Sequence, residues 1–330
     1  MSGRFDELRI FTGNGSPELA QAISTRLNIP IGDCTVASFV NENIFVRLNE
    51  SVREKDVFVV QSLCSPLSDR IMELVIMLDA VRRAAAGRVT AVIPYYPYGR
   101  TDKRDQPRVP ITARLLADMM QVAGAQQVIT MDLHAGQIQG FFNIPVDELS
   151  AMTLLARHFA ERNWDDVTVV SPDLGFAKRA RNFAELLGAP LAIVEKRRIQ
   201  SLNNKDGQLT RVEALNLIGE VDGRRCILVD DEMMTGGSMI EAAELLMERG
   251  AREVYACAVH GVLAGNASER LANSVITEVV TTDTLPIPAD KRWPGLKTVT
   301  IAPLLAEVIQ RIHSGISVDT IFRRHNPSLG

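Results

Sequence analysis

The chain has 330 residues, 46% of them hydrophobic and 23% charged, which is ordinary globular composition in a chain long enough for two domains. Its net charge of -4 argues against a general nucleic-acid binder and against a protein held at membrane surfaces by charge. No apolar run approaches the roughly 20 residues of a membrane span, and residues 1–10 lack the apolar core of a signal peptide, so we expect a cytoplasmic protein.

Short apolar runs alternate along the chain with helical patterns. The runs predict strands at residues 8–11, 57–61, 89–94, 128–131, 167–170, 191–194, 226–229, 254–259, 275–280 and 298–301. Helical patterns lie at residues 17–27, 68–85, 111–123, 151–162, 176–187 and 239–249. Ser16 and Pro17 should begin the first helix, and Gly250 should end the last. The alternation predicts an α/β protein with mainly parallel sheets flanked by helices, and about ten strands favour two sheets over one.

The two halves of the chain are organised alike. The apolar run 128–131 leads into an acidic strand end, and so does the run 226–229. We therefore place a domain boundary in the segment Ile144–Ser150, which gives domains of residues 1–150 and 151–330. Small-molecule chemistry is expected in the cleft between two such halves.

Two segments of the first half carry groups suited to a nucleotide. Phe39 is able to stack on a base, with Asn41 and Asn43 beside it to read the edge of that base. Residues 95–110 form a basic segment around Arg100 whose side chains suit phosphates. A core Phe beside a turn and a solvated charged loop are the alternatives.

A histidine and a carboxylate follow two other predicted strands. His134 comes after the run 128–131 and can ligate a metal, although Mg²⁺ prefers oxygen and a histidine that only hydrogen-bonds explains the pattern as well. Asp173, after the run 167–170, suits a metal or a ribose, and a turn formed by Pro-Asp-x-Gly is the alternative.

The cationic segment Glu195–Arg198 follows the strand predicted at 191–194 and opens a polar stretch, 199–207, which we interpret as a mobile cationic loop. Lysine and arginine are the groups that phosphoryl transfer needs, because negative charge builds on non-bridging oxygens. A loop can also close over a polyphosphate and exclude water. A solvated charged face is the alternative.

The most informative segment, Cys226–Ser238, joins a buried strand to two carboxylates and then to a turn of glycines and hydroxyls that opens a helix. Asp230 and Asp231 should lie at the carboxyl end of the strand, where they can accept hydrogen bonds from ribose hydroxyls and help hold Mg²⁺ through water. The turn Thr235–Ser238 offers backbone N–H groups that attract a phosphate. The motif predicts a ribose 5-phosphate site, with an acidic strand end before an ordinary Gly-Gly turn as the alternative.

Together these motifs resemble the ribose-phosphate pyrophosphokinase family over nearly the whole chain. The matching segments are residues 11–20, 72–77, 91–95, 132–134, 137–142, 171–173, 196–198, 230–238 and 302–307. The resemblance implies two similar phosphoribosyltransferase-like domains, each a mainly parallel sheet flanked by helices, with the last helix packing back on the N-terminal domain. It also implies a homo-oligomer built from dimers, commonly a hexamer.

The resemblance implies a reaction as well. The C1 hydroxyl of ribose 5-phosphate would attack the β-phosphorus of Mg-ATP, giving 5-phosphoribosyl 1-diphosphate and AMP for nucleotide biosynthesis. The implied catalytic residues are Lys196, Arg198 and His134, and the implied Mg²⁺ ligands are His134 and Asp173. The residues implied for ATP are Phe39, Asn41, Asn43, Arg100 and Thr101, the first three from a neighbouring subunit. Those implied for ribose 5-phosphate are Asp230, Asp231, Met234, Thr235, Gly236, Gly237 and Ser238.

Two departures from the family pattern leave other hypotheses open. Met234 stands where the family loop carries an Asp, and Phe176 stands where it carries a Gly. A catalytically weak paralog that binds and regulates an active synthetase would tolerate such changes. A phosphoribosyltransferase shares the paired-Asp loop, but it would leave Phe39, Arg100 and His134 without a task. We favour the enzyme because the residues that the reaction needs are all present.

Overall fold

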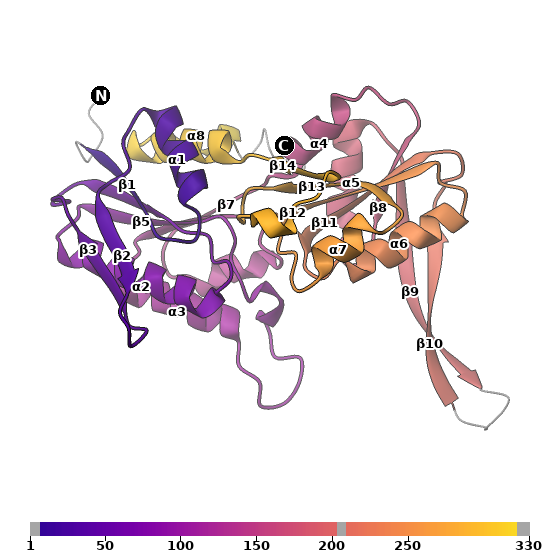
Figure 1. Ribbon diagram of the computed structural model, residues 1–330, viewed down its shortest axis with the longest axis horizontal. Coiled ribbons are helices and arrows are strands. Elements are labelled where there is room, and N and C mark those ends of the chain that lie inside the picture. Colours follow the sequence, from indigo (N-terminus) through magenta and orange to yellow (C-terminus); the bar gives the residue numbers. More distant parts are fainter. Residues whose placement is uncertain (1–6, 203–208, 322–330) are drawn as a thin grey trace. The chain divides into compact units, whose positions relative to one another are not determined.

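The computed structural model describes residues 7–202 and 209–321, with side chains described for all of these except residues 196–214 (Figure 1). The chain forms two compact units. Within the described part, the first unit holds residues 7–151, 283–286 and 300–321, and the second holds residues 152–202, 209–282 and 287–299. The domains predicted as 1–150 and 151–330 remain a prediction. No helix within the described ranges is long and apolar enough to cross a membrane.

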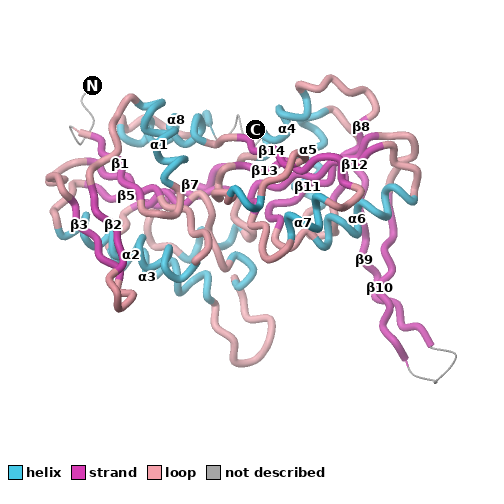
Figure 2. Tube along the Cα trace, viewed as in Figure 1, coloured by secondary structure: helices cyan, strands magenta, loops and turns pink. Residues whose placement is uncertain are grey.

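The first unit is built on a five-stranded parallel sheet. Its strands, in spatial order, are β1 (Leu8–Thr12), β4 (Asp56–Val60), β5 (Arg88–Ile93), β6 (Gln127–Met131) and β7 (Val146–Leu149). The helices α1 (Pro17–Leu27) and α8 (Ala302–His313) lie on one face, and α2 (Leu67–Arg83) and α3 (Thr112–Ala123) lie on the other (Figures 1 and 2). Because both faces are covered, every residue of β4 is buried, which explains why residues 57–60 form a continuous apolar run.

Three of the strands described in the first unit were not predicted from the sequence. One of them, β7, lies within the segment 144–150 and pairs with β6 in parallel. This edge strand is short and carries two carboxylates, so it lacks the apolar run of a buried strand. The hairpin of β2 (Cys34–Ser38) and β3 (Ile44–Leu48) was not predicted either, since its residues are half-buried or exposed.

The second unit is built on a seven-stranded sheet. Its strands, in spatial order, are β10 (Leu209–Ile218), β9 (Leu191–Leu202), β8 (Val167–Ser171), β11 (Arg225–Met233), β12 (Glu253–Gly261), β13 (Ile276–Thr282) and β14 (Leu296–Val299). All pairs are parallel except that of β10 with β9. The helices of this unit are α4 (Met152–Ala160), α5 (Ala177–Leu187), α6 (Gly237–Glu248) and α7 (Ala267–Ala272). The α/β fold class with two mainly parallel sheets is confirmed.

The predicted cationic loop after residue 194 is wrong as local structure. β9 continues to Leu202, and its backbone pairs with the antiparallel β10, so that Arg198 is in register with Glu213. The two strands project from the rest of their sheet as a long hairpin (Figure 1). Residues 196–202 were not predicted as a strand because this part of β9 projects beyond the sheet. A projecting strand has no apolar core to pack on, so its sequence need not alternate between apolar and polar residues.

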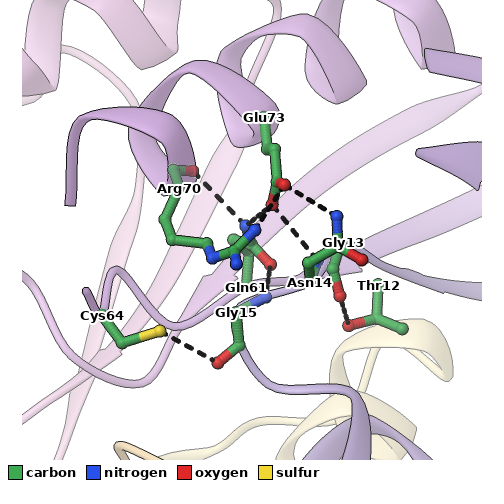
Figure 3. A network of polar contacts seen from close by, with 8 residues as sticks. All are labelled: Thr12, Gly13, Asn14, Gly15, Gln61, Cys64, Arg70 and Glu73. Atoms are coloured by element: carbon green, nitrogen blue, oxygen red, sulfur yellow. Dashed lines mark hydrogen bonds and ion pairs between the residues drawn. The ribbon is translucent and has the colours of Figure 1, made fainter. Parts of the chain in front are cut away.

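A partly buried polar network joins the β1–α1 turn to α2 in the first unit (Figure 3). The carboxylate of Glu73 accepts hydrogen bonds from the Asn14 side chain at 2.7 Å, the Asn14 backbone at 3.2 Å and the Gln61 amide at 2.8 Å. Arg70 forms an ion pair with the same carboxylate at 2.5 Å. Burial alone would raise the pKa of Glu73, but the bonds from Asn14, Arg70 and Gln61 outweigh burial and lower it.

An ionic cluster fixes the end of α8 on the first sheet. The fully buried carboxylate of Asp56, in β4, accepts two bonds from Arg88, at 2.8 and 2.5 Å. Arg88 also donates to the carbonyl of Ile312 at 3.1 Å, and the Nδ1 atom of His313 lies 2.9 Å from Asp56. Residues far apart in the sequence therefore hold the end of α8 on the sheet of the first unit.

Candidate functional site

The paired carboxylates of the second unit lie near the carboxyl end of β11. Asp230 is in register with Ala258 of β12, and the strand continues to Met233. The carboxylates are therefore inside the last part of the strand rather than after it, which corrects the predicted strand end at residue 229. The strand end was predicted too early because the acidic residues after Val229 end the apolar run, although the pairing with β12 continues through them.

The two carboxylates are close and sit in a partly water-excluded place. Asp231 is 3% exposed, and its backbone N–H donates to Oδ1 of Asp230 at 2.9 Å. Burial, and after it the negative charges of Asp231 and Asp173, together raise the pKa of Asp230 to about 8. The Nη1 atom of Arg179 lies 3.8 Å from Oδ2 of Asp231. A carboxylate with a raised pKa near the end of a strand is typical of a site that binds a cation or hydroxyl groups.

The residues predicted to bind a phosphate form the turn between β11 and α6. Met234, Thr235 and Ser238 are exposed, and Gly236 has a φ of 71°. A Cβ added at Gly236 would lie 3.0 Å from the side chain of Leu271, so both the backbone conformation and the space favour glycine. α6 begins at Gly237, so the first amides of the helix belong to this turn. The predicted phosphate turn thus has the local structure of an anion site.

Asp173 lies in the turn after β8, which is adjacent and parallel to β11. Its side chain is exposed, and its Oδ1 atom accepts a hydrogen bond from the Phe176 backbone at 2.9 Å. Phe176 is 7% exposed, with the guanidinium of Arg179 5.9 Å from its ring centre. The bulky residue that stands in place of a glycine is therefore packed inward, and the Asp173 carboxylate remains at the surface.

The predicted catalytic residues Lys196 and Arg198 lie on β9, which neighbours β8. Their backbones pair with Leu215 and Glu213 of β10, and their side chains lie outside the described part of the structure.

In the first unit, Arg100, Thr101 and His134 lie on two turns that touch. Arg100 and Thr101 belong to the short helix η1 (Gly99–Thr101) after β5, and His134 follows β6. A Cβ added at Gly99 would lie 2.8 Å from the Cβ of His134. Arg100 and His134 are both exposed. The structure therefore brings the predicted ATP residues of η1 beside the predicted catalytic histidine.

The turn that carries His134 is held by neighbouring side chains. Glu148 of β7 accepts a hydrogen bond from the Leu133 backbone at 2.9 Å, and Gln137 donates to Asp102 of the basic segment. Asp132 accepts a bond from the Ala151 backbone at 2.7 Å. These contacts fix both turns relative to the sheet, although none of them was predicted from the sequence.

Phe39, Asn41 and Asn43 lie elsewhere, at the tip of the β2–β3 hairpin. Phe39 is 58% exposed, and its ring centre is 5.5 Å from that of Phe45. The Asn43 backbone donates to the Asn41 side chain at 3.3 Å. A large exposed aromatic group at a hairpin tip fits a surface that contacts another molecule better than a core position.

Comparisons with known proteins place the chain among close relatives. Residues 8–124 match the model of the N-terminal domain of ribose phosphate pyrophosphokinase, and residues 206–323 match the phosphoribosyl synthetase-associated domain. The chain is 51% identical to the ribose-phosphate pyrophosphokinase of Caldanaerobacter subterraneus, covering 96% of this chain and 98% of the relative. It is 50% identical to that of Clostridium acetobutylicum, covering 96% and 97%.

A solved structure agrees with these relatives. The crystal structure of phosphoribosylpyrophosphate synthetase from Mycobacterium smegmatis is similar with a TM-score of 0.86 and 43% sequence identity, covering 93% of this chain and 98% of that one.

Proposed function

The chain belongs to the ribose-phosphate pyrophosphokinase family of enzymes, and from that premise we propose that it transfers diphosphate from Mg-ATP to the C1 hydroxyl of ribose 5-phosphate. The products are 5-phosphoribosyl 1-diphosphate and AMP. The observation that carries the proposal is the Asp230–Asp231 pair of β11, followed at once by the glycine turn that opens α6. The relatives named above all carry the name of the enzyme, and nothing favours a regulatory paralog.

The second unit binds the sugar phosphate in this proposal. Asp230 and Asp231 accept hydrogen bonds from ribose hydroxyls, which replace the water that a partly buried carboxylate lacks. The turn of Met234, Thr235, Gly236, Gly237 and Ser238 binds the 5-phosphate with its amides and hydroxyls, helped by the positive end of the α6 dipole. Recognition at both ends of the sugar fixes the direction in which its C1 hydroxyl points.

The first unit binds ATP. Arg100 and Thr101 contact the nucleotide, and the neighbouring His134 contacts its phosphates and helps to position the metal. Phe39 stacks on adenine while Asn41 and Asn43 bind its edge. We place this hairpin tip in the site of a neighbouring subunit, so that a homo-oligomer is required for full activity.

Lys196 and Arg198 stabilise the negative charge that develops on the transferred diphosphate. The C1 oxygen forms a bond to the β-phosphorus while the bond from that phosphorus to the α-phosphate oxygen breaks. The electron pair leaves with AMP, and the proton of the C1 hydroxyl is released to the solvent. No group on the enzyme becomes covalently modified.

The donor set fits Mg²⁺ held mainly by the substrate. Within residues 7–202 and 209–321, no group of three or more His, Cys, Asp or Glu is arranged to hold a metal. Mg²⁺ is commonly bound by one or two carboxylates together with substrate phosphates, and the exposed carboxylate of Asp173 suits that role better than the imidazole of His134. Bound Mg²⁺ would neutralise charge on the ATP phosphates.

The test combines product analysis with one substitution. Purified protein with ATP, ribose 5-phosphate and Mg²⁺ should form AMP and 5-phosphoribosyl 1-diphosphate together, and neither without the sugar phosphate. Lys196→Ala should lower turnover at least about a hundredfold, as expected when a charge that stabilises the transition state is lost. The equilibrium affinity for ATP should remain unchanged.

Lys297→Ala is the matched control, because Lys297 is an exposed lysine on β14 of the same unit. Its turnover should equal that of the unaltered protein. Equal loss of turnover and ATP affinity in Lys196→Ala would contradict the role given to Lys196, and ATP hydrolysis without a sugar product would contradict the proposed reaction.

A further inference from the structure

The turn after β11 is supported from one side by the segment that follows β12. Three consecutive carbonyl groups of the turn each accept a hydrogen bond from that segment. The carbonyl of Met233 accepts from the Leu263 backbone at 3.1 Å, and that of Met234 accepts from the Ala264 backbone at 2.8 Å. The third carbonyl, that of Thr235, accepts from Nη1 of Arg270 at 3.3 Å.

The direction of these carbonyls determines the direction of the amides. A trans peptide group is planar, and its N–H points opposite to its C=O. The N–H groups of Met234, Thr235 and Gly236 therefore point away from the supporting segment. Successive amides that point to one side form a concave site for an anion. The support thus fixes the donors that the proposed function assigns to the 5-phosphate.

Arg270 is the only one of these three donors that is a side chain, so it can be changed without altering the backbone. It lies on α7, next to Leu271, whose side chain packs against Gly236. A Cβ added at Gly237 would lie 3.7 Å from Nη2 of Arg270. The guanidinium therefore lies beside the first residue of α6, and its positive charge is close to the turn that would bind the phosphate.

We propose that Arg270 is a positioning residue for the 5-phosphate of the sugar substrate, acting through its hydrogen bond to the Thr235 carbonyl. The inference rests on the proposed function and adds to it a residue that lies 32 positions beyond the phosphate turn in the sequence. Arg270 holds the Thr235–Gly236 peptide with its N–H toward the ligand, and its charge lowers the cost of gathering a phosphate dianion beside two carboxylates.

The experiment measures the equilibrium dissociation constants of ribose 5-phosphate and of ATP separately, by calorimetry, for the full-length protein. Arg270→Met keeps the length of the side chain and removes the donors and the charge. We expect the dissociation constant of ribose 5-phosphate to rise about tenfold, or about 1.4 kcal/mol, with that of ATP unchanged. Arg270→Lys, which keeps one donor and the charge, should recover binding to within about threefold.

The matched control is Arg249→Met, which removes an exposed arginine at the opposite end of α6. That end lies about 18 Å from the turn, since the helix rises about 1.5 Å per residue. It tests whether a change in net charge alone weakens binding, and it should bind both ligands like the unaltered protein. Thermal melting of each variant checks that the fold is intact.

The outcomes separate this inference from the proposed function. If the unaltered protein does not bind ribose 5-phosphate, the proposed function fails. If it binds and Arg270→Met binds equally well, the role of Arg270 is wrong. Loss of both ligands together, or failure of Arg270→Lys to recover what Arg270→Met loses, would show a structural role and would also overturn the inference.

Discussion

Glu73 in the first unit and Asp230 in the second are both carboxylates withdrawn from water, but their surroundings act on them in opposite directions. Burial favours the neutral form of each. At Glu73 the bonds from Asn14, Arg70 and Gln61 outweigh burial, and the pKa falls. At Asp230 the nearest charges are other carboxylates, and the pKa rises to about 8.

The difference separates a structural carboxylate from a functional one. A carboxylate with several protein donors is satisfied without a ligand and holds two elements together. A carboxylate placed beside like charges is stabilised only when a cation or hydroxyl groups arrive. Glu73 therefore stabilises the fold of the first unit. Asp230 lowers the stability of the ligand-free second unit, and the binding of a ligand offsets that loss.

The largest expected effect is the loss of stability when Glu73 is replaced. Glu73→Ala leaves the Arg70 guanidinium and the Asn14 donors without their acceptor, so the free energy of unfolding should fall by about 3 kcal/mol in urea titrations. Because the pKa of Glu73 is lowered in the folded protein, its stabilisation is present above its ordinary value of 4.5. The deficit of the variant should therefore shrink as the pH falls through the folded pKa.

Glu18→Ala is the control for Glu73→Ala, because Glu18 is an exposed glutamate in the first turn of α1. It should cost no more than about 1 kcal/mol, the value of a favourable helix-dipole contact. Equal losses in the two variants would mean that the network around Glu73 contributes nothing particular.

The second prediction is a gain in stability rather than a loss. The pKa of Asp230 is about 8 in the folded protein, and its ordinary value is 3.8. Between these two pH values the folded protein binds more protons than the unfolded chain. The free energy of unfolding therefore declines as the pH rises from 3.8 to about 8. Asp230→Asn carries no charge, so it should stabilise the ligand-free, metal-free protein above pH 8. We expect about 2 kcal/mol, a reduced share of the shift because Asp230 is partly exposed.

Thermal melting between pH 4 and 9 tests the Asp230→Asn prediction. The gain should vanish near the ordinary pKa of 3.8, while the affinity for ribose 5-phosphate falls. A variant that is less stable than the unaltered protein at pH 9 would show that Asp230 is satisfied by the protein itself.

The smallest effect comes from adding a carboxylate to the same site. Met234→Asp restores the acidic residue of the family loop at an exposed position, so it should tighten ribose 5-phosphate binding a few-fold, by less than about 1 kcal/mol. The ligand-free protein should lose a similar amount of stability through repulsion. An unchanged affinity in calorimetry would show that the backbone donors of the turn suffice.

Much of the fold could be predicted from the sequence, because strands buried on both faces are mostly apolar. Residues 8–11 and 57–61 were placed this way, and α1 has the predicted bounds. The pattern fails where a strand lacks two covered faces. β7 is a short edge strand, β2 and β3 form an exposed hairpin, and β9 and β10 continue beyond their sheet.

The site was predictable to the extent that its residues are adjacent in the sequence. Asp230 and Asp231 lie in the last part of one strand and the turn to Ser238 follows it directly, so the strand-end rule places them together. Arg270 and Arg179 lie on other elements, and only the packing of the second unit brings them to this turn. In the same way, the contact of Gly99 with His134 depends on the order of β5 and β6 in the sheet.

The central claim is that a diphosphate group, rather than a single phosphate, moves to the sugar. The most direct measurement uses ATP labelled at the β-phosphorus, with ribose 5-phosphate and Mg²⁺, and follows the label by chromatography. The account predicts that the label appears in 5-phosphoribosyl 1-diphosphate in amounts equal to the AMP formed. Label retained in ADP, with only the γ-phosphate transferred, would contradict the account.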